Sequence, residues 1–129
     1  MSEAGAHWYT RPVWGVADIA HSLEFYVGKL GFKEDWRYAE ANRPLIVQLS
    51  RPGCELILSS QWPERVGQGL SFISLDVGVL DALRAEFTAR QVAVRDGEWG
   101  YRLMVVEDPD GNTLYFPYPA EAESQESAA

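Results

Sequence analysis

The stretch that decides the fold is Glu98–Phe116, which reads EWGYRLMVVEDPDGNTLYF. Its flanks, Arg102–Glu107 and Thr113–Phe116, are rich in β-branched and aromatic residues, which is typical of strands. Between them, Asp108–Asn112 has the chemistry of a tight turn. Proline fixes φ at one corner, glycine accepts a positive φ, and the Asp and Asn side chains hydrogen-bond local backbone. The stretch therefore predicts a β-hairpin, and because many β proteins contain one, its meaning depends on the rest of the chain.

Length, charge and cysteine content limit the class of protein. A chain of 129 residues with 47% apolar residues suits one domain with a substantial core. The net charge of −8 argues against nucleic acid as a partner and is compatible with a cationic or neutral small molecule. No apolar run is long enough to span a membrane, and the N-terminus lacks the regions of a signal peptide. With a single cysteine, Cys54, the sequence predicts a cytoplasmic protein that binds no membrane.

Periodicity indicates one order of elements, strand, helix and then several strands, occurring twice. In the first half we expect a helix that Asp18 caps and Gly31 ends, and these elements: a strand at 9–16, the helix at 19–30, and strands at 32–38, 45–50 and 55–59, with a loop at Arg43-Pro44. In the second half we expect a strand at 70–77, a helix at 79–90, a short strand at 92–95, and the hairpin within 99–116.

These elements predict an α+β fold made of two βαβββ modules. Neither module can bury its sheet alone, so we expect both to form a curved mixed sheet with helices outside and a concave cavity inside. The predicted single domain covers 8–118, with module one at 8–60, a linker at 61–69 and module two at 70–118. The remaining segments, 1–7 and 119–129, read as flexible tails.

Three segments resemble the vicinal oxygen chelate superfamily, which includes glyoxalase I, extradiol dioxygenases, and fosfomycin and bleomycin resistance proteins. The first is Val16–Tyr26 followed by Leu30-Gly31-Phe32, similar to the family's opening strand and helix. The second, Trp99–Arg102, resembles the W-G-x-R of the bleomycin-resistance branch, and the third, Asp108–Phe116, resembles the family's D-P-D-G-N hairpin. Together they span about residues 8–118 and imply the glyoxalase/bleomycin resistance fold. They specify chemistry much less, because this fold hosts several functions.

Metal-dependent members of this family hold a divalent ion with His and Glu on inward-facing strands, and the resemblance lets those positions be located here. They fall on Arg11, Phe72 (Ser71 if the register differs by one), Tyr115 and a position near Ile57. None of these is a metal ligand, and Glu55 is the one carboxylate nearby on the same face. His7 lies in the expected tail and His21 on the solvent side of a helix. The sequence therefore predicts neither a metal site nor a cofactor.

Aromatic residues suit a binding role. The expected inner faces, or the loop beside them, carry Trp36, Tyr38, Phe72, Trp99 and Tyr115, which could stack on a flat heteroaromatic ring. Core packing remains the alternative for each ring singly, and we assign Trp14 to the core outright. Arg102 either anchors an acidic group of the ligand or stabilises the loop before its strand. The alternation of the second strand places Phe32, Glu34, Trp36 and Tyr38 on one face.

Three functions are compatible with these observations. The first is a metal-free binding protein similar to bleomycin resistance proteins, which the resemblance implies to be a homodimer, often with exchanged N-terminal strands, holding its ligand in crevices at the dimer interface. The second is a lyase or isomerase acting on a small metabolite through Glu55 or a metal site unlike the family's own. Glu34, Glu55 and Asp76 are the carboxylates expected to line the cavity, unless they pair with Arg11 or lie at the rim. The third is an accessory or ligand-sensing module without catalysis.

Overall fold

The computed structural model describes residues 7–76 and 78–118, so most of both predicted tails lies outside the described residues. The first half contains β1 (Val13–Gly15), α1 (Ile19–Tyr26), β2 (Lys33–Glu40), β3 (Arg43–Arg51), β4 (Cys54–Ser59) and a single 3₁₀ turn (Pro63–Arg65). The second contains β5 (Leu70–Phe72), α2 (Val79–Ala89), β6 (Val94–Glu98), β7 (Arg102–Glu107) and β8 (Thr113–Pro117).

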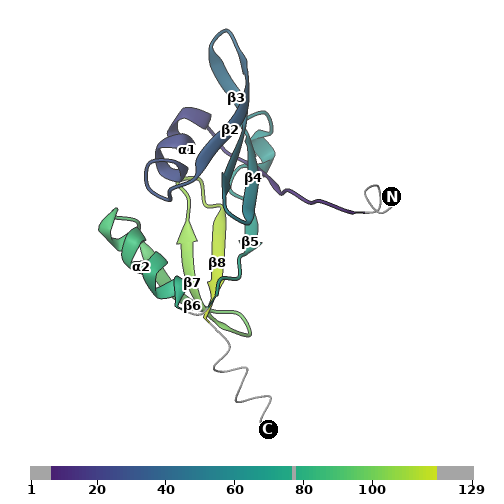
Figure 1. Cartoon of the computed structure of the whole chain (residues 1–129). Helices are drawn as coiled ribbons and strands as arrows, with labels where there is room; N and C mark the ends of the chain where they lie inside the picture. Colours follow the sequence, from purple (N-terminus) through teal and green to yellow (C-terminus); the bar gives the residue numbers. More distant parts are fainter. Residues whose placement is uncertain (1–6, 77, 119–129) are drawn as a thin grey trace.

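The strands form two four-stranded sheets, in the orders β1-β4-β3-β2 and β5-β8-β7-β6. Each sheet is mixed, because its first strand runs parallel to its neighbour, β4 or β8, while the other pairs are antiparallel. In Figure 1 the first sheet and α1 form the upper part of the molecule, and the second sheet and α2 the lower part. The predicted α+β class with two βαβββ modules is confirmed.

Both helices pack against one face of the sheets and join the modules in one core. Helix α1 begins as predicted, with Asp18 Oδ2 accepting a hydrogen bond from the backbone N–H of His21 at 2.9 Å. One cluster of buried side chains takes residues from both modules, including Tyr26 and Leu49 from the first and Phe87 and Met104 from the second. Trp14 is buried in this cluster, as predicted. None of the described helices is long and apolar enough to cross a membrane.

The Asp108–Asn112 turn fastens the two modules together. The hydroxyl of Tyr26 in α1 donates to Asp108 Oδ2 at 2.8 Å. Asn112 donates from Nδ2 to the carbonyl of Gly15 at 3.0 Å, and its Oδ1 accepts from the N–H of Gly69 at 2.7 Å. Both turn side chains are buried, so each of these hydrogen bonds is made where water does not compete. The turn therefore also holds the two modules together, and we refer to these hydrogen bonds of Tyr26, Asp108 and Asn112 as the clamp.

Several element boundaries differ from the sequence prediction. The predicted strands at 9–16 and 70–77 shorten to β1 and β5, the residues that pair with β4 and β8. The predicted loop at Arg43-Pro44 belongs to β3 instead. Pro44 pairs with Ala39 of β2 at a register shift, beyond the last pair of β3 with β4, and such an irregular position at a sheet edge tolerates proline. The turn falls at Ala41 and Asn42, which have φ values of 51° and 65°.

One prediction for the second strand is wrong: one face of the sheet does not carry all of Phe32, Glu34, Trp36 and Tyr38. The register of β2 shifts between Glu34 and Trp36, because Asp35 is an extra residue in the ladder. Glu34 pairs with Leu49 and shares its side of the sheet, whereas Trp36 pairs with Gln48 and points to the opposite side. A one-residue bulge thus turns both aromatic rings of β2 away from the core.

Candidate ligand-binding faces

Each sheet has a helix-free face, opposite the one that packs against the core. On the first sheet this face carries Gln48, because the neighbouring Val47 and Leu49 both point into the core. Arg11 Nη1 donates to Gln48 Oε1 at 2.5 Å, and Gln48 Nε2 donates to Asp35 Oδ2 at 3.0 Å. The pKa of Asp35 is lowered, chiefly by this hydrogen bond from Gln48, so its carboxylate stays charged. A connected polar row therefore crosses this face.

Trp36 and Tyr38 lie on the same helix-free face, nearer the tip of the β2–β3 hairpin. They pair with Gln48 and Ile46, and their exposed fractions are 43% and 46%. The hydroxyl of Tyr38 donates to Glu40 Oε2 at 2.5 Å. Exposure of two large rings beside a polar row is compatible with the predicted contact with a ligand, and it excludes core packing for both rings in this chain.

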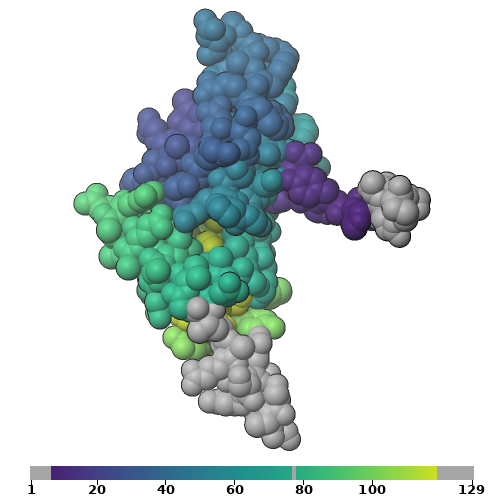
Figure 2. All heavy atoms as spheres, viewed as in Figure 1, coloured from purple at the N-terminus to yellow at the C-terminus, as the bar shows by residue number. Residues whose placement is uncertain are grey.

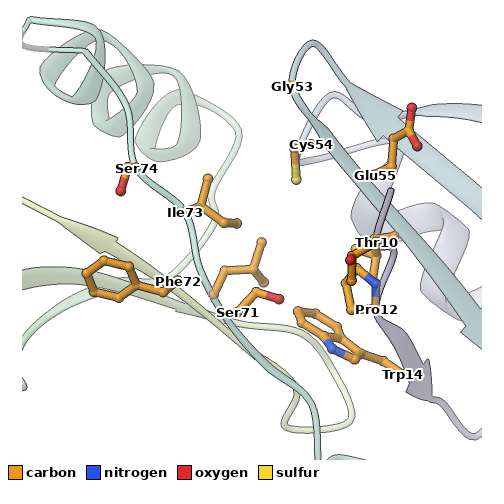
Figure 3. Close-up of a pocket in the computed structure, with 12 residues that line it drawn as sticks. Thr10, Pro12, Trp14, Gly53, Cys54, Glu55, Ser71, Phe72, Ile73 and Ser74 are labelled. Atoms are coloured by element: carbon orange, nitrogen blue, oxygen red, sulfur yellow. The ribbon is translucent and has the colours of Figure 1, made fainter. Parts of the chain in front are cut away.

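Glu55 lies at the end of the polar row and has an unusual environment. It pairs with Ser50, so it belongs to the helix-free face, while its neighbour Cys54 packs against the core. Figure 3 shows these two side chains pointing to opposite sides of β4. Glu55 Oε1 is buried and has no hydrogen-bond partner among the described residues. A buried polar atom without a partner is uncommon, which marks Glu55 for a role beyond packing.

Glu34, another predicted cavity carboxylate, is engaged elsewhere. Its two oxygens accept from Arg37 Nε at 2.6 Å and Nη2 at 2.9 Å. This pairing lowers the pKa of the Glu34 carboxyl, so Glu34 is a poor proton acceptor near neutral pH. Asp76 is exposed in the segment between β5 and α2. Of the three carboxylates, the structure places Glu55 beside the polar row.

The helix-free face of the second sheet carries an aromatic cluster of Phe72, Trp99, Tyr101 and Tyr115. The ring centroid of Phe72 lies 5.7 Å from that of Trp99 and 5.6 Å from that of Tyr101. Trp99 and Tyr115 are 6.1 Å apart. The four residues come from β5, β8 and the loop before β7, and Trp99 is 61% exposed. The structure thus brings three of the predicted residues together and adds Tyr101, which its position between Trp99 and Arg102 could have indicated.

Arg102 does not join this cluster. Its guanidinium lies 4.5 Å from the ring centroid of Tyr118, which packs against the core. Arg102 also precedes Leu103 and shares its side of β7 with the core residue Met104. Of the two roles predicted for Arg102, this geometry favours the structural one.

A pocket of about 260 Å³ lies at the seam between the modules (Figure 3). Trp14 and Pro12 form one wall, Ser71 and Ile73 the other, and the Cys54 side chain points in from β4. Burial raises the pKa of the Cys54 thiol, so it is a weak nucleophile. The seam pocket is separate from the aromatic cluster except for Phe72, which lines both.

The positions at which the resemblance would place metal ligands carry Arg11, Phe72, Tyr115 and Ile57 on the two helix-free faces, and Glu55 beside Ile57 is the one carboxylate near them. Over residues 7–76 and 78–118, no three His, Cys, Asp or Glu side chains converge as a metal-binding group. A guanidinium, a phenyl ring and a phenol do not supply the neutral nitrogen or carboxylate donors that a divalent ion needs. The residues present therefore do not fit the family's metal centre.

Comparisons with known proteins agree with this architecture. A family model described as "Glyoxalase superfamily protein" matches residues 6–123. No curated protein sequence matches the chain significantly.

Solved structures share the fold at low sequence identity. TnmS3, an antibiotic binding protein from Streptomyces sp. CB03234, is 24% identical with a TM-score of 0.69, over 88% of this chain and 98% of that one. The bleomycin-binding protein of Streptomyces verticillus, complexed with copper(II)-bleomycin, is 24% identical with a TM-score of 0.68, over 88% and 97%. Lactoylglutathione lyase from Agrobacterium tumefaciens is 18% identical with a TM-score of 0.65, over 87% and 94%.

Proposed function

This chain belongs to the glyoxalase superfamily, and we propose that within it the protein binds and sequesters a planar aromatic small molecule. The observation that carries this proposal is the cluster of Phe72, Trp99, Tyr101 and Tyr115, whose rings stand together at the surface of the second sheet. Exposed apolar patches of this kind mark binding sites more often than chance. Flat rings stack well on such side chains, which lose little conformational entropy when they bind.

The ligand we propose is cationic or neutral. The net charge of −8 disfavours anions, and aromatic π faces attract cations directly. Two structures with the same fold are an antibiotic binding protein and a bleomycin-binding protein, which supports an antibiotic as the ligand and sequestration in the cytoplasm as the route to resistance. Because Arg11, Phe72 and Tyr115 do not suit a divalent ion and no group of metal donors converges among residues 7–76 and 78–118, the binding that we propose does not depend on a metal ion held by the protein.

We further propose that the ligand cavity forms between two copies of the chain. The helix-free faces of the two sheets both carry exposed aromatic rings, and a second copy would let the first sheet of one protomer lie opposite the second sheet of its partner. The first described residues, 7–9, run out from the body at the purple end of the chain in Figure 2, and Trp8 is 94% exposed. An aromatic arm of this kind is suited to contact with the partner. In this arrangement Trp36 and Tyr38 face the partner's aromatic cluster. Each protomer contributes residues 8–118 as a single domain.

The test is tryptophan fluorescence with two probes, metal-free bleomycin and the planar cation proflavine. We expect saturable quenching, weakened about 5- to 30-fold by Phe72→Ala, since an aromatic contact contributes about 1–2 kcal/mol. Trp62→Phe, between β4 and β5 and outside the aromatic cluster, serves as the matched control and should retain the wild-type affinity. Quenching by proflavine but not by bleomycin would restrict the ligand class, and absence of saturation with both probes would refute the proposal.

One observation favours a second candidate, a lyase or isomerase that uses Glu55. A carboxylate oxygen without a partner is a reasonable proton acceptor, and a lactoylglutathione lyase shares the fold. The two candidates differ in their metal requirement. Titration of the purified protein with Ni²⁺, Zn²⁺ and Mn²⁺ should show no stoichiometric site if the protein is a metal-free binder, whereas tight binding of one ion per chain would favour the enzyme.

A further inference from the structure

The helix-free face of the first sheet holds an unsatisfied hydrogen-bond acceptor. Glu55 Oε1 is buried without a partner in the described part of the chain, although a carboxylate oxygen accepts readily from N–H and O–H donors. The last torsion of a glutamate is soft, so either oxygen can turn toward the open side of the sheet. The folded chain alone therefore leaves this carboxylate short of a donor.

A donor lies on the same face of the sheet as this acceptor. Arg11 reaches Gln48 of β3, and Ser50, two residues along β3 from Gln48, pairs with Glu55. Arg11 donates to Gln48 at 2.5 Å, and its guanidinium carries further N–H groups that can donate elsewhere. Gln48 in turn donates to Asp35, which fixes the direction of its amide and so the position of Arg11.

From this arrangement we propose that Glu55 and Arg11 hydrogen-bond to polar groups at the edge of the ligand's ring. Glu55 accepts from an N–H or O–H donor of the ligand, and Arg11 donates to an adjacent acceptor. The inference rests on the proposed function, since the ring itself is held by the aromatic cluster. It names the ligand class more closely: a planar ring that carries a donor and an acceptor side by side, as in a primary carboxamide. Ring stacking gives such a site affinity, and the pair of polar contacts gives it specificity.

Two probes of nearly equal shape test this reading. Quinoline-3-carboxamide presents an N–H donor beside its carbonyl, and methyl quinoline-3-carboxylate keeps the ring and the carbonyl but has no N–H. Dissociation constants from ligand-observed NMR titration of the full chain should favour the amide by about tenfold, the usual contribution of a hydrogen bond to a charged group in a buried site.

Substitutions test which residue causes the stronger binding of the amide than of the ester. Glu55→Leu should bring the amide-to-ester ratio close to one, and Glu55→Gln should leave a smaller preference because its carbonyl still accepts. Arg11→Gln should weaken both probes by similar factors and keep the ratio, since both contain the carbonyl. Glu24→Gln removes an exposed carboxylate on α1 and should behave as wild type.

The outcomes separate the two proposals. Equal binding of both probes by the wild type, or an unchanged ratio in Glu55→Leu, would overturn the assignment of Glu55 while leaving ring binding intact. A direct ion pair between Arg11 and Glu55 within the protein would also overturn the assignment, because Glu55 would then already have its donor. Failure of the wild type to bind either probe would overturn the proposed function and this inference with it.

Discussion

Replacing Tyr26 by phenylalanine tests the clamp between the modules. The change removes one hydroxyl, whose hydrogen bond to Asp108 Oδ2 is 2.8 Å long and buried. Asp108 keeps three donors, the N–H groups of Asp110 and Asn112 and the Nδ2 of Asn112, each at 2.9 Å. We therefore expect a loss of about 1.5–2 kcal/mol in the free energy of unfolding, at the lower end of the range for hydrogen bonds to charged groups.

For a chain of this size that loss corresponds to a fall in Tm of roughly 5–10 °C, measured by circular dichroism or calorimetry. Tyr9→Phe is the matched control, because the same hydroxyl is removed from an exposed ring. Equal stability of the two variants would refute the idea that the clamp joins the modules.

The pH dependence of the free energy of unfolding tests the role of Tyr26 in a second way. Burial, and then the charge of Asp108, raises the pKa of Tyr26 well above its ordinary value. A group whose pKa is raised on folding keeps its proton in the native state, so its stabilising contribution is complete below the unfolded pKa near 10 and is lost as pH rises above it. Wild-type stability should fall by about 1.4 kcal/mol per pH unit in that alkaline range from this group alone. Tyr26→Phe should show a shallower slope, and an unchanged slope would contradict the assignment.

Three further substitutions test other contacts. Asn112→Ala should cost about 2–4 kcal/mol in urea unfolding, because it leaves the N–H of Gly69 without its partner and removes one of the two donors to the carbonyl of Gly15, and a loss below 1 kcal/mol would count against the clamp. Gly69→Ala should lower stability by about 1–3 kcal/mol, since the added Cβ would meet the buried Trp14 ring at 2.4 Å, and an unchanged stability would show that the ring moves aside without cost. Arg102→Ala should lower Tm by a few degrees and leave proflavine affinity unchanged, whereas a selective loss of affinity would restore its role as a ligand anchor.

The fold could be predicted from the sequence because its signals are local. The Asp18 cap and the Asp108–Asn112 turn each follow from residue types whose backbone preferences are strong. The end of α1 was predicted less well, because the helix stops at Tyr26 and Gly31, with a φ of 78°, lies several residues later. The order of strands and helices recurs in both halves of the chain and specifies two βαβββ modules. The role of the turn as a clamp was less accessible, because its partners Tyr26 and Gly15 are distant in sequence.

The site was predicted only in part, because its geometry depends on features without a sequence signature. The bulge at Asp35 shifts Trp36 relative to Glu34, and a bulge of one residue reverses every later face in a strand. The row from Arg11 through Gln48 to Asp35 joins the segment before β1 to β3 and β2, so no spacing along the chain indicates it. The aromatic cluster was largely predicted because alternation placed Phe72 and Tyr115 on one face, where the structure pairs them directly.

The central claim, that the aromatic cluster binds a planar ligand, is tested most directly by NMR of the tryptophan side chains. With indole groups labelled by ¹⁵N, the five tryptophans of the chain report separately on their surroundings. Titration with proflavine should shift the indole signal of Trp99 most and, if the cavity lies between two protomers, that of Trp36 as well. The signals of the buried Trp14 and of Trp62 in the linker should stay in place. Saturable shifts confined to Trp62, or no shift at Trp99 at saturating probe, would contradict the account.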